Sequence, residues 1–294
     1  MNTETFRFTL GKFNCMVISD GTMSYAPPMF PPPANFLFAN APKEQLDKAL
    51  SEMGLSPQSW VKWDSSYNCL LVETAKQKVL IDTGADGLGP NTGKLLLNMK
   101  QGGITPEDID VVILTHGHPD HIGGNVNNEG KLVFPKARWI MRKDEFEFWT
   151  SDLTARKFAE RGLQRMTDTA RKNLLPLEKQ IELVDEETEI TSGIKTIAAP
   201  GHTPGQIALD ISSGGKHLIY ISDILLHPLH FAVPEWHGER DVLPDQAILT
   251  RRKILTKLAA EKPLVMAFHL PFPGLGHVIP KEKAWQWQPI GTIV

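Results

Sequence analysis

Four side chains that can bind metal ions lie close together in the middle of the chain. His116, His118, Asp120 and His121 directly follow the apolar run at 111–114. Burying these polar groups without a partner would cost on the order of 1 to 3 kcal/mol for each group. A metal ion satisfies several such groups at once, so this segment predicts a metal site.

The spacing within this segment fits two ions. His116 and His118 are two positions apart, so an extended or loop backbone can turn both side chains the same way. Asp120 and His121 begin a new turn, which we expect to be the start of a short helix. From there, both side chains can face a second ion.

Side chains of the same kind follow three later apolar runs. IKTIAAPG leads to His202, HLIYIS leads to Asp223, and LVMAF leads to His269. Because α/β folds gather their sites at strand ends, these side chains are expected to converge on the first four. Imidazole and carboxylate ligands suit zinc, iron, cobalt or manganese. The seven residues exceed the four ligands of a tetrahedral structural zinc, and they suffice for two ions that share one carboxylate.

Strands and helices alternate along the chain, which predicts a layered α/β fold. We expect two short strands within 5–19, a hairpin at 66–84 and a buried strand at 111–114. The apolar spacing predicts helices at 43–54, 92–100, 154–172 and about 245–260. No shift in composition divides the chain. A single domain over residues 1–294 is therefore expected, with an N-terminal extension over about residues 1–65.

The segment APPMFPPPANF contains five prolines between positions 27 and 33. Proline lacks a backbone donor, so we expect the segment to run over the surface and not to form a helix or a central strand. One interpretation is a simple connector. The other is a lid or a dimer arm, because Met29, Phe30 and Phe36 are too apolar for a free linker.

Composition excludes several classes of protein. Hydrophobic residues make up 41% and charged residues 22%, which is typical of a globular protein. The net charge of -3 gives no basic field for nucleic acid or anionic lipid. We find no signal peptide and no run of about 18 apolar residues that could span a membrane, so we expect a cytoplasmic protein. Cys15 and Cys69 are expected to be buried free thiols.

The motif THGHPDH at 115–121, GHTPGQ at 201–206 and the later Asp223 and His269 resemble the metallo-β-lactamase superfamily. The earlier VLIDTGADG at 79–87 is similar to the usual DTG strand end of that family. The resemblance covers about residues 66–270. It implies an αββα four-layer sandwich with a dinuclear metal site between its two sheets.

Matching the motif residue by residue implies a ligand set. Metal one would be held by His116, His118 and His202, metal two by Asp120, His121 and His269, with Asp223 bridging and Asp82 behind the ligands. The two divalent ions are expected to be zinc, with iron, cobalt or manganese as alternatives. Asp120 and Asp223 are the expected catalytic residues. A hydroxide between the ions would be the nucleophile, and Asp120 would move the proton.

Within the superfamily, the chain most resembles the lactonase and methyl parathion hydrolase branch. The features that carry this are the long N-terminal segment and the sequence FHLPFPGLGH at 268–277. Leu226 stands where many acyl-homoserine lactonases have a tyrosine that contacts the lactone carbonyl. We therefore expect a hydrolase of lactones or aryl esters, with phosphotriester hydrolysis as a main or side reaction. The alternatives are an acyl-homoserine lactonase, a thioesterase of the glyoxalase II type, a nuclease and a non-catalytic metal-binding module.

The substrate is expected to be a small ester, lactone or organophosphate, bound in an apolar pocket. A homodimer formed through the proline-rich arm is also expected. The predicted pocket walls are Leu88, Phe148, Trp149, Leu226, Phe231 and Phe272. His227, His230, His237 and His277 are interpreted as loop residues near the site. His217 is interpreted as a strand surface residue, and Arg251, Arg252 and Lys253 as a solvated helix face.

Overall fold

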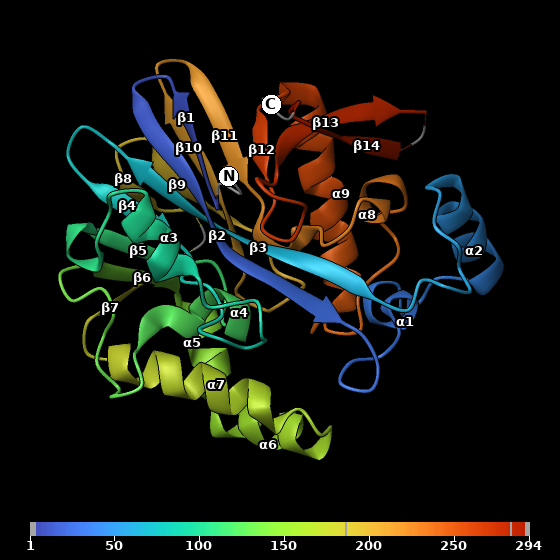
Figure 1. The fold of residues 1–294 in the computed structure, drawn as a ribbon, viewed down its shortest axis with the longest axis horizontal. Coiled ribbons are helices and arrows are strands. Elements are labelled where there is room, and N and C mark those ends of the chain that lie inside the picture. The colour runs from blue at the N-terminus through green and yellow to red at the C-terminus, as the bar shows by residue number, and fades with distance from the viewer. Residues whose placement is uncertain (1–3, 186, 283, 292–294) are drawn as a thin grey trace.

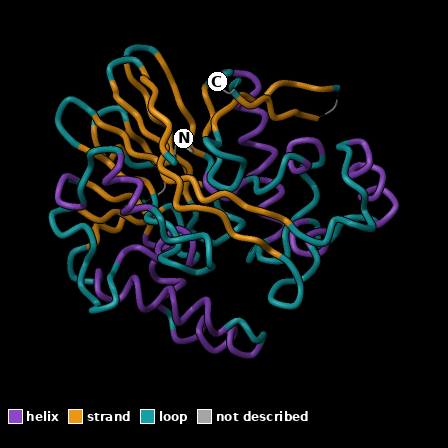
Figure 2. Tube along the Cα trace, viewed as in Figure 1, coloured by secondary structure: helices purple, strands orange, loops and turns teal. Residues whose placement is uncertain are grey.

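Two sheets occupy the centre of the molecule, with helices outside them (Figure 1). The structure, a computed structural model, describes residues 4–185, 187–282 and 284–291. Figure 2 separates strands from helices by colour and shows the helices on both outer sides of the strands. Loops that follow the strands lie between these layers and carry the site.

The first sheet comes from the N-terminal half of the chain and has seven strands within the described residues. In spatial order they are β1 (Thr5–Leu10), β2 (Phe13–Tyr25), β3 (Trp63–Glu73), β4 (Lys78–Ile81), β5 (Val111–Leu114), β6 (Arg138–Arg142) and β7 (Ile181–Val184). Neighbours from β1 to β4 are antiparallel, whereas neighbours from β4 to β7 are parallel. The parallel pairing of β4 and β5 brings the loops after these strands to the same edge.

The second sheet comes from the C-terminal half, and its described part also has seven strands. In spatial order they are β14 (Ala284–Pro289), β13 (Leu275–Lys281), β12 (Leu264–Met266), β11 (Lys216–Tyr220), β10 (Ile207–Ser213), β9 (Ile194–Ala198) and β8 (Glu189–Thr191). β11 and β12 are parallel, and the other neighbours are antiparallel. The loops after β11 and β12 therefore also start from one edge.

Apolar side chains of both sheets meet in the larger of two buried clusters among the described residues. A single cluster of buried residues contains Val17 of β2 and Ile211 of β10 together with all four residues of β5. The side chains of β5 are 0% exposed. A strand can be apolar on both faces only if layers cover it on both sides, which explains the uninterrupted run VVIL.

The helices lie outside the sheets and complete the αββα four-layer sandwich that the sequence predicts. α3 contacts β2, α5 contacts β6 and β7, α8 contacts β14, and α9 contacts β13. The α-helices are α1 (Pro33–Leu37), α2 (Lys43–Glu52), α3 (Leu95–Gln101), α4 (Pro119–Ile122), α5 (Lys143–Thr150), α6 (Asp152–Glu160), α7 (Gln164–Leu174), α8 (Leu229–Ala232) and α9 (Pro244–Glu261). Short 3-10 helices lie at Pro106–Asp108, Gly123–Asn125, Leu175–Leu177 and Ser222–Ile224.

The single helix expected over 154–172 is two helices in the structure, α6 and α7. Gly162 has a φ of +71°, a left-handed conformation that ends α6. The N–H of Leu163 bonds to the Phe158 carbonyl at 2.7 Å, and the N–H of Gly162 bonds to the Ala159 carbonyl at 2.9 Å. This hydrogen-bond pattern closes a helix C-terminus, and it explains why the apolar spacing continued across the break.

Three smaller predictions have mixed outcomes. The second N-terminal strand continues to Tyr25, beyond the expected end at residue 19. The proline-rich segment does include a helix, because Pro33 occupies the first position of α1, where no backbone donor is needed. Cys15 and Cys69 are buried free thiols, as expected. Among the described residues, no helix combines the length and the apolar character required to cross a membrane.

The prediction of a solvated face at 251–253 is wrong for Arg251, whose side chain is 1% exposed. Its guanidinium donates hydrogen bonds to the backbone carbonyls of Ile224, Pro234 and Trp236 at 2.6–3.0 Å. It also lies 3.7 Å from a carboxylate oxygen of Asp241. Arg251 therefore ties α9 to the loops that follow β11 and α8.

Replacement of Arg251 by methionine is expected to lower the free energy of unfolding by about 3 to 5 kcal/mol, because it leaves a buried carboxylate without its cation. The matched control is Arg252→Met, which removes a half-exposed arginine paired with Glu235. That change should cost no more than about 1 kcal/mol. Urea denaturation followed by circular dichroism measures both values. Equal losses in the two variants would contradict the structural role of Arg251.

Candidate metal centre and active site

The seven predicted ligands meet between the two sheets, at the ends of four strands. The loop after β5 carries His116 and His118, and α4, which follows at once, carries Asp120 and His121. The other three follow strands of the second sheet: His202 after β9, Asp223 after β11 and His269 after β12. All seven are buried, with at most 7% of each residue exposed.

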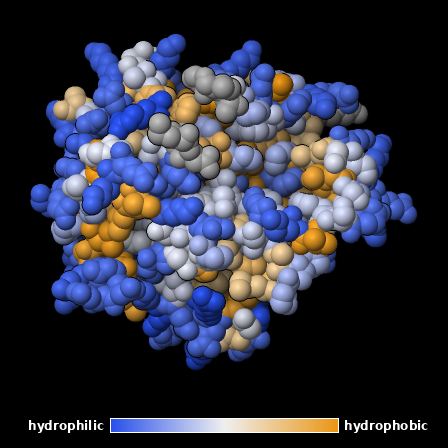
Figure 3. All heavy atoms as spheres, in the orientation of Figure 1, coloured by the Kyte–Doolittle hydropathy of each residue, from blue (hydrophilic) through white to orange (hydrophobic). Residues whose placement is uncertain are grey.

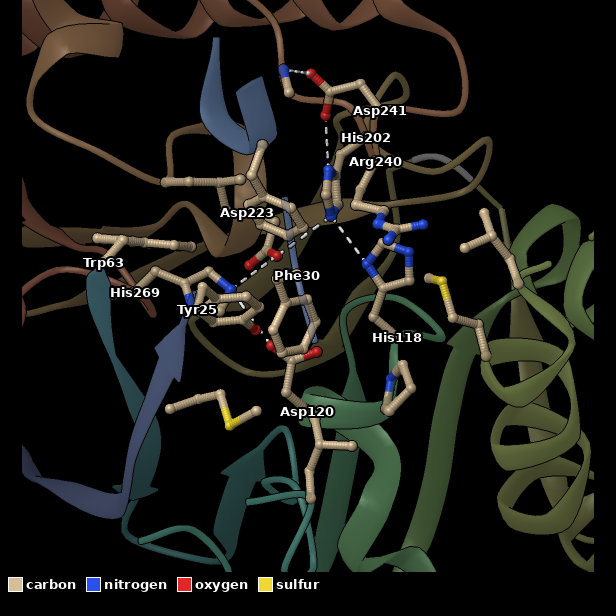
Figure 4. Close-up of a pocket in the computed structure, with 18 of the residues that line it drawn as sticks. Tyr25, Phe30, Trp63, His118, Asp120, His202, Asp223, Arg240, Asp241 and His269 are labelled. Carbon is tan, nitrogen blue, oxygen red and sulfur yellow. Dashed lines mark hydrogen bonds and ion pairs between the residues drawn. The ribbon is translucent and has the colours of Figure 1, made fainter. Parts of the chain in front are cut away.

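His116, His118, His202 and Asp223 form the first of two groups. One ligand atom from each lies within 4.8 Å of the others. Nδ1 of His118 is 2.9 Å from Nε2 of His202, which lies 3.3 Å from Oδ2 of Asp223 (Figure 4). Nε2 of His116 is 3.7 Å from the same oxygen. This is a compact set of three imidazoles and one carboxylate.

Asp120, His121 and His269 form the second group, again with ligand atoms within 4.8 Å of one another. Nε2 of His269 lies 3.6 Å from Oδ2 of Asp120 and 3.0 Å from Oδ2 of Asp223. Nε2 of His121 lies 3.1 Å from the other oxygen of Asp223. The Asp223 carboxylate therefore faces both groups, in the position of a shared ligand.

The donor atoms fit divalent metal ions. Nε2 of His116, Nε2 of His121 and Oδ1 of Asp223 are buried and make no hydrogen bond. Buried polar atoms without a partner are rare in folded proteins, and here they face one another. Nitrogen and oxygen donors in two adjoining groups suit a pair of zinc-like cations. The described residues thus form a site for two divalent metal ions.

Three of the histidines have a polar side chain within 2.8 Å of Nδ1, and Nδ1 of His116 lies 3.3–3.4 Å from the hydroxyls of Thr115 and Ser222. Nδ1 of His121 lies 2.8 Å from Asp82, and Nδ1 of His202 lies 2.7 Å from Asp241. Nδ1 of His269 lies 2.8 Å from the hydroxyl of Ser65. Such partners fix the ring orientation and leave Nε2 directed at the metal. The sequence motif identified Asp82, whereas Asp241 and Ser65 lie outside any motif and were missed.

Two residues next to the ligands have strained backbones. Asp82 has a φ of +60° and Ser222 a φ of +46°, in the left-handed region that such residues rarely adopt. Asp82 accepts hydrogen bonds from the N–H and hydroxyl of Thr115 and from the hydroxyl of Tyr220, at 2.8–3.0 Å. The hydroxyls of Ser222 and Thr115 lie 2.8 Å apart. These hydrogen bonds stabilise the strained backbone at both residues. Strained backbones of this kind are common at functional sites.

The histidines of the site differ in their pKa values. Burial is the main cause that lowers the pKa of His116 and His118 well below the usual range, so both rings are neutral and can bind metal. Burial also lowers the pKa of His202, but its contacts with Asp223 and Asp241 outweigh this effect and raise the value to about 9. A cation bound at Nε2 therefore competes with a proton, and binding should weaken as the pH falls.

Glu145 holds the loop that carries His116 and His118. This role was not predicted from the sequence. Its buried carboxylate accepts hydrogen bonds from the N–H groups of Gly117 and Gly205, both at 2.8 Å, and from Trp149 at 2.6 Å. Glycine is required at both backbone positions. A Cβ on Gly117 would lie 2.3 Å from the Trp149 ring, and one on Gly205 would lie 2.4 Å from the Glu145 nitrogen.

A cavity of about 270 Å³ lies over the ligands. His118, Asp120, His202, Asp223 and His269 form part of its lining, and the rest is mainly apolar. The apolar wall consists of Met23, Tyr25, Met29, Phe30, Phe36, Trp63, Leu88, Leu163, Met166 and Leu226. Apolar side chains gather at the lower centre of Figure 3, beside the segment that follows β2. That segment is therefore part of the cavity wall.

Leu88 and Leu226 lie in the cavity wall, but the other four predicted wall residues do not. Trp149 and Phe231 are 0% exposed, Trp149 beneath His118 and Phe231 against Trp287. Phe148 packs on Trp149 and Phe158, and Phe272 packs against the main core. Phe148, Trp149, Phe231 and Phe272 are therefore not among the residues that line this cavity, because aromatic residues near a site also form the core that supports it.

The aromatic part of the wall was missed. Tyr25 stacks on Trp63 with 4.9 Å between ring centroids, and it contacts Phe30 and Phe36 at 4.6 and 5.0 Å. Tyr25 and Trp63 are register partners at the ends of β2 and β3. Only the pairing of these two strands brings the rings together, and no local motif signals it.

The remaining histidines lie outside the two metal groups. His227 and His230 are buried and packed against Phe38. The interpretation as loop residues is wrong for His230, which lies in α8, and for His277, which lies in β13. Burial lowers the pKa of His227 to about 4. His237 and His277 bond to backbone carbonyls at 3.0 and 2.9 Å. The side chain of His217 is 54% exposed on β11, which agrees with a strand surface residue.

The fold and the site together define the class of protein. The sequence model of the Metallo-beta-lactamase superfamily matches residues 63–269, a range that includes all seven predicted ligands. The chain therefore belongs to the metallo-β-lactamase superfamily, as its motif indicates. The prediction of a metal-dependent hydrolase is confirmed at this level.

Two solved structures resemble the chain over nearly its whole length. AidC, a dizinc quorum-quenching lactonase solved with a product N-hexanoyl-L-homoserine, has a TM-score of 0.88 at 28% identity, covering 99% of this chain and 98% of its own. The hydrolase AbOPH of the beta lactamase superfamily has a TM-score of 0.87 at 28% identity, covering 100% of both chains. The N-acyl homoserine lactonase AiiA of Bacillus thuringiensis subsp. kurstaki is 24% identical over 239 residues, which cover 74% of this chain and 82% of AiiA.

Replacement of Asp241 by asparagine is expected to weaken metal binding by about 10- to 100-fold, because His202 loses the carboxylate that orients it. Competition with a chelating dye measures this affinity. The matched control is Asp210→Asn, which removes a carboxylate 3.3 Å from the exposed His217. That control should leave the affinity unchanged. Equal affinity in folded Asp241→Asn protein and in the parent chain would exclude the orienting role.

Proposed function

We propose that this protein is a dinuclear metal-dependent hydrolase of lactones or aryl esters. The observation that carries the proposal is the convergence of seven buried ligand residues beneath an apolar cavity. The volume of about 270 Å³ suits a small ester. The lactonases among its relatives support the same class of substrate.

We infer that the resident ions are zinc, with iron, cobalt or manganese as alternatives. The donor set of imidazole and carboxylate supports this inference, as does the dizinc centre of AidC. Bound at the two groups, the ions would supply Lewis acidity and a water whose pKa is lowered to about 7. Asp223 would hold both ions, since its two oxygens face both groups.

Asp120 has the position expected of a proton carrier. It lines the cavity, and its Oδ2 lies 3.6 Å from His269. A carboxylate in this place can accept a proton from the attacking water and give it to the leaving alkoxide. Burial of both catalytic aspartates, Asp120 and Asp223, limits competition from bulk water.

The apolar wall would bind the part of the substrate that does not react. Tyr25, Phe30 and Trp63 form an aromatic surface next to Asp120 and His269 (Figure 4). Aromatic surfaces stabilise flat or extended apolar groups through burial and edge contacts. The aromatic part of the wall is supplied by the N-terminal segment, which we propose to be part of one domain with the rest of the chain.

Acyl-homoserine lactone and phosphotriester hydrolysis are narrower versions of this function. The relatives AidC and AiiA support the former. Leu226, which lies in the cavity wall, offers no hydroxyl to a lactone carbonyl and leaves room for other substrates. A thioesterase, a nuclease and a non-catalytic module remain as alternatives for the test below.

Removal of the metals is expected to abolish hydrolysis in a panel of dihydrocoumarin, an acyl-homoserine lactone, paraoxon and nitrocefin. We expect the enzyme to hydrolyse the lactones. A chelator should stop this hydrolysis, and added zinc should restore it. Replacement of Asp223 by asparagine should lower kcat/KM by about 100-fold or more, because both ions lose a ligand. Elemental analysis should find fewer than two ions per chain in this variant.

The control for Asp223→Asn is Asp168→Asn, which makes the same change at an exposed position on α7. It should keep both the activity and the metal content. Full activity with two bound ions in Asp223→Asn would refute the assignment of the shared ligand. Absence of chelator-sensitive turnover across the panel would favour the thioesterase, nuclease or non-catalytic alternatives.

A further inference from the structure

One cation in the cavity wall has no part in the metal centre. Arg240 lines the cavity, and Figure 4 shows its guanidinium beside the ring of His118. The next residue, Asp241, also borders the cavity, but its carboxylate is bonded to Nδ1 of His202 at 2.7 Å. Two consecutive residues therefore serve different parts of the site. Asp241 supports a ligand, and Arg240 faces the space where a substrate would lie.

The Arg240 guanidinium lacks the partner that a partly buried cation usually has. Its Nη1 atom is buried and makes no hydrogen bond, and no ion pair forms between Arg240 and any carboxylate in the described part of the chain. The guanidinium lies 5.8 Å from the centroid of the Phe36 ring, which orients it without neutralising it. Burial lowers the pKa of Arg240, and the charge of the nearby Glu239 only partly opposes this. Arginine nevertheless stays protonated, so the charge remains available.

The backbone on both sides of Arg240 is fixed. The N–H of Glu239 bonds to the Phe36 carbonyl at 2.9 Å, and the N–H of Val242 bonds to the His202 carbonyl at 3.0 Å. Asp241 accepts a hydrogen bond from the N–H of Gly238 at 2.9 Å. A side chain on such a loop loses little backbone freedom when it binds a ligand. Arg240 is thus positioned before the substrate arrives.

Two further arginines lie near Arg240, although the whole chain has a net charge of -3 and the cavity lining also contains Asp120, Asp223 and Asp241. Arg165 also lines the cavity, and Arg161 lies over the ring of Phe158. Neither arginine forms an ion pair with a carboxylate among the residues that the structure describes. A cluster of one sign next to an apolar cavity attracts ligands of the opposite sign.

We propose that Arg240 binds a carboxylate on the non-reacting part of the substrate. The enzyme would then prefer esters or lactones that carry a negative charge away from the bond that is cleaved. A guanidinium matches a carboxylate with two parallel hydrogen bonds, and the apolar wall covers the spacer between the two ends of the substrate. This inference rests on the proposed hydrolytic function.

The test compares pairs of esters that differ only in charge. One member is a 4-nitrophenyl monoester of succinate, glutarate or adipate, and the other is the same compound with its free carboxylate methylated. We expect kcat/KM of the metal-loaded enzyme to favour the anionic member by about ten- to hundredfold for at least one spacer length, as a charge-assisted hydrogen bond provides. This preference should decrease as salt is added, because the arginine is partly exposed.

Two substitutions separate charge from shape. In Arg240→Met the ratio of kcat/KM between anionic and neutral esters should fall by about tenfold or more, since the apolar stem remains and the charge is lost. Arg240→Lys should keep an intermediate ratio, because lysine retains the charge without the planar pair of donors. The control is Arg156→Met, which removes one exposed positive charge on α6 outside the cavity lining. The control should keep the ratio of the parent enzyme.

Either of two results would overturn the proposal: a parent enzyme without any preference for the anionic esters, or an unchanged ratio in Arg240→Met. Absence of turnover on every ester would instead count against the hydrolytic function. In that case a binding measurement still tests the role of Arg240. The protein is titrated with 4-phenylbutyrate or with its neutral amide, and the fluorescence of Trp63 and the other tryptophans is followed. Tighter binding of the carboxylate, lost in Arg240→Met and kept in Arg156→Met, would support the role of Arg240. Equal binding of both compounds would reject it.

Discussion

The structure depends on one electrostatic constraint, the burial of the Asp223 carboxylate among histidine rings. Its two oxygens lie 3.0–3.7 Å from Nε2 of His116, His121, His202 and His269, and the residue is 3% exposed. An anion in the protein interior must be balanced by nearby positive charge. Histidines from both sheets provide the ligand atoms for cations that meet this requirement. The two halves of the sandwich are therefore joined through the metal centre as well as through the apolar core.

The same constraint explains the features around the ligands. Of the four rings that face Asp223, those of His121, His202 and His269 are oriented through Nδ1 by Asp82, Asp241 and Ser65. Nδ1 of His116 lies 3.3–3.4 Å from the hydroxyls of Thr115 and Ser222. The left-handed backbone at Asp82 follows from the same need, because its carboxylate must reach Thr115, His121 and Tyr220 together. Arg251 extends the network by pairing with Asp241 from α9. A local change at one partner should therefore affect metal binding as well as stability.

The layered fold and the convergence of the seven candidate ligand residues could be predicted from the sequence, because both depend on local patterns. An apolar run followed by a side chain that can bind metal can be recognised in the sequence without knowing which strand pairs with it. The cavity wall could not be predicted in this way. Tyr25 and Trp63 meet only through the register of β2 and β3, and Arg251 looks like a surface residue until α9 is packed. Phe231 and Trp149 show the opposite case, since aromatic residues close to the site belong to its supporting core.

The residues for the reaction and the residues for substrate binding therefore lie on different parts of the fold. The ligands lie at the ends of strands in both sheets, where a shift in one side chain would disturb the buried charge balance. Much of the wall lies on connecting segments, such as the loop with Met29 and Phe30 and the loop with Arg240. Connecting segments tolerate substitution better than buried strand ends do. Arg240, proposed to bind substrate, and Asp241, which orients His202, lie next to each other in one loop. A substitution that changes specificity at position 240 must therefore preserve the backbone at position 241.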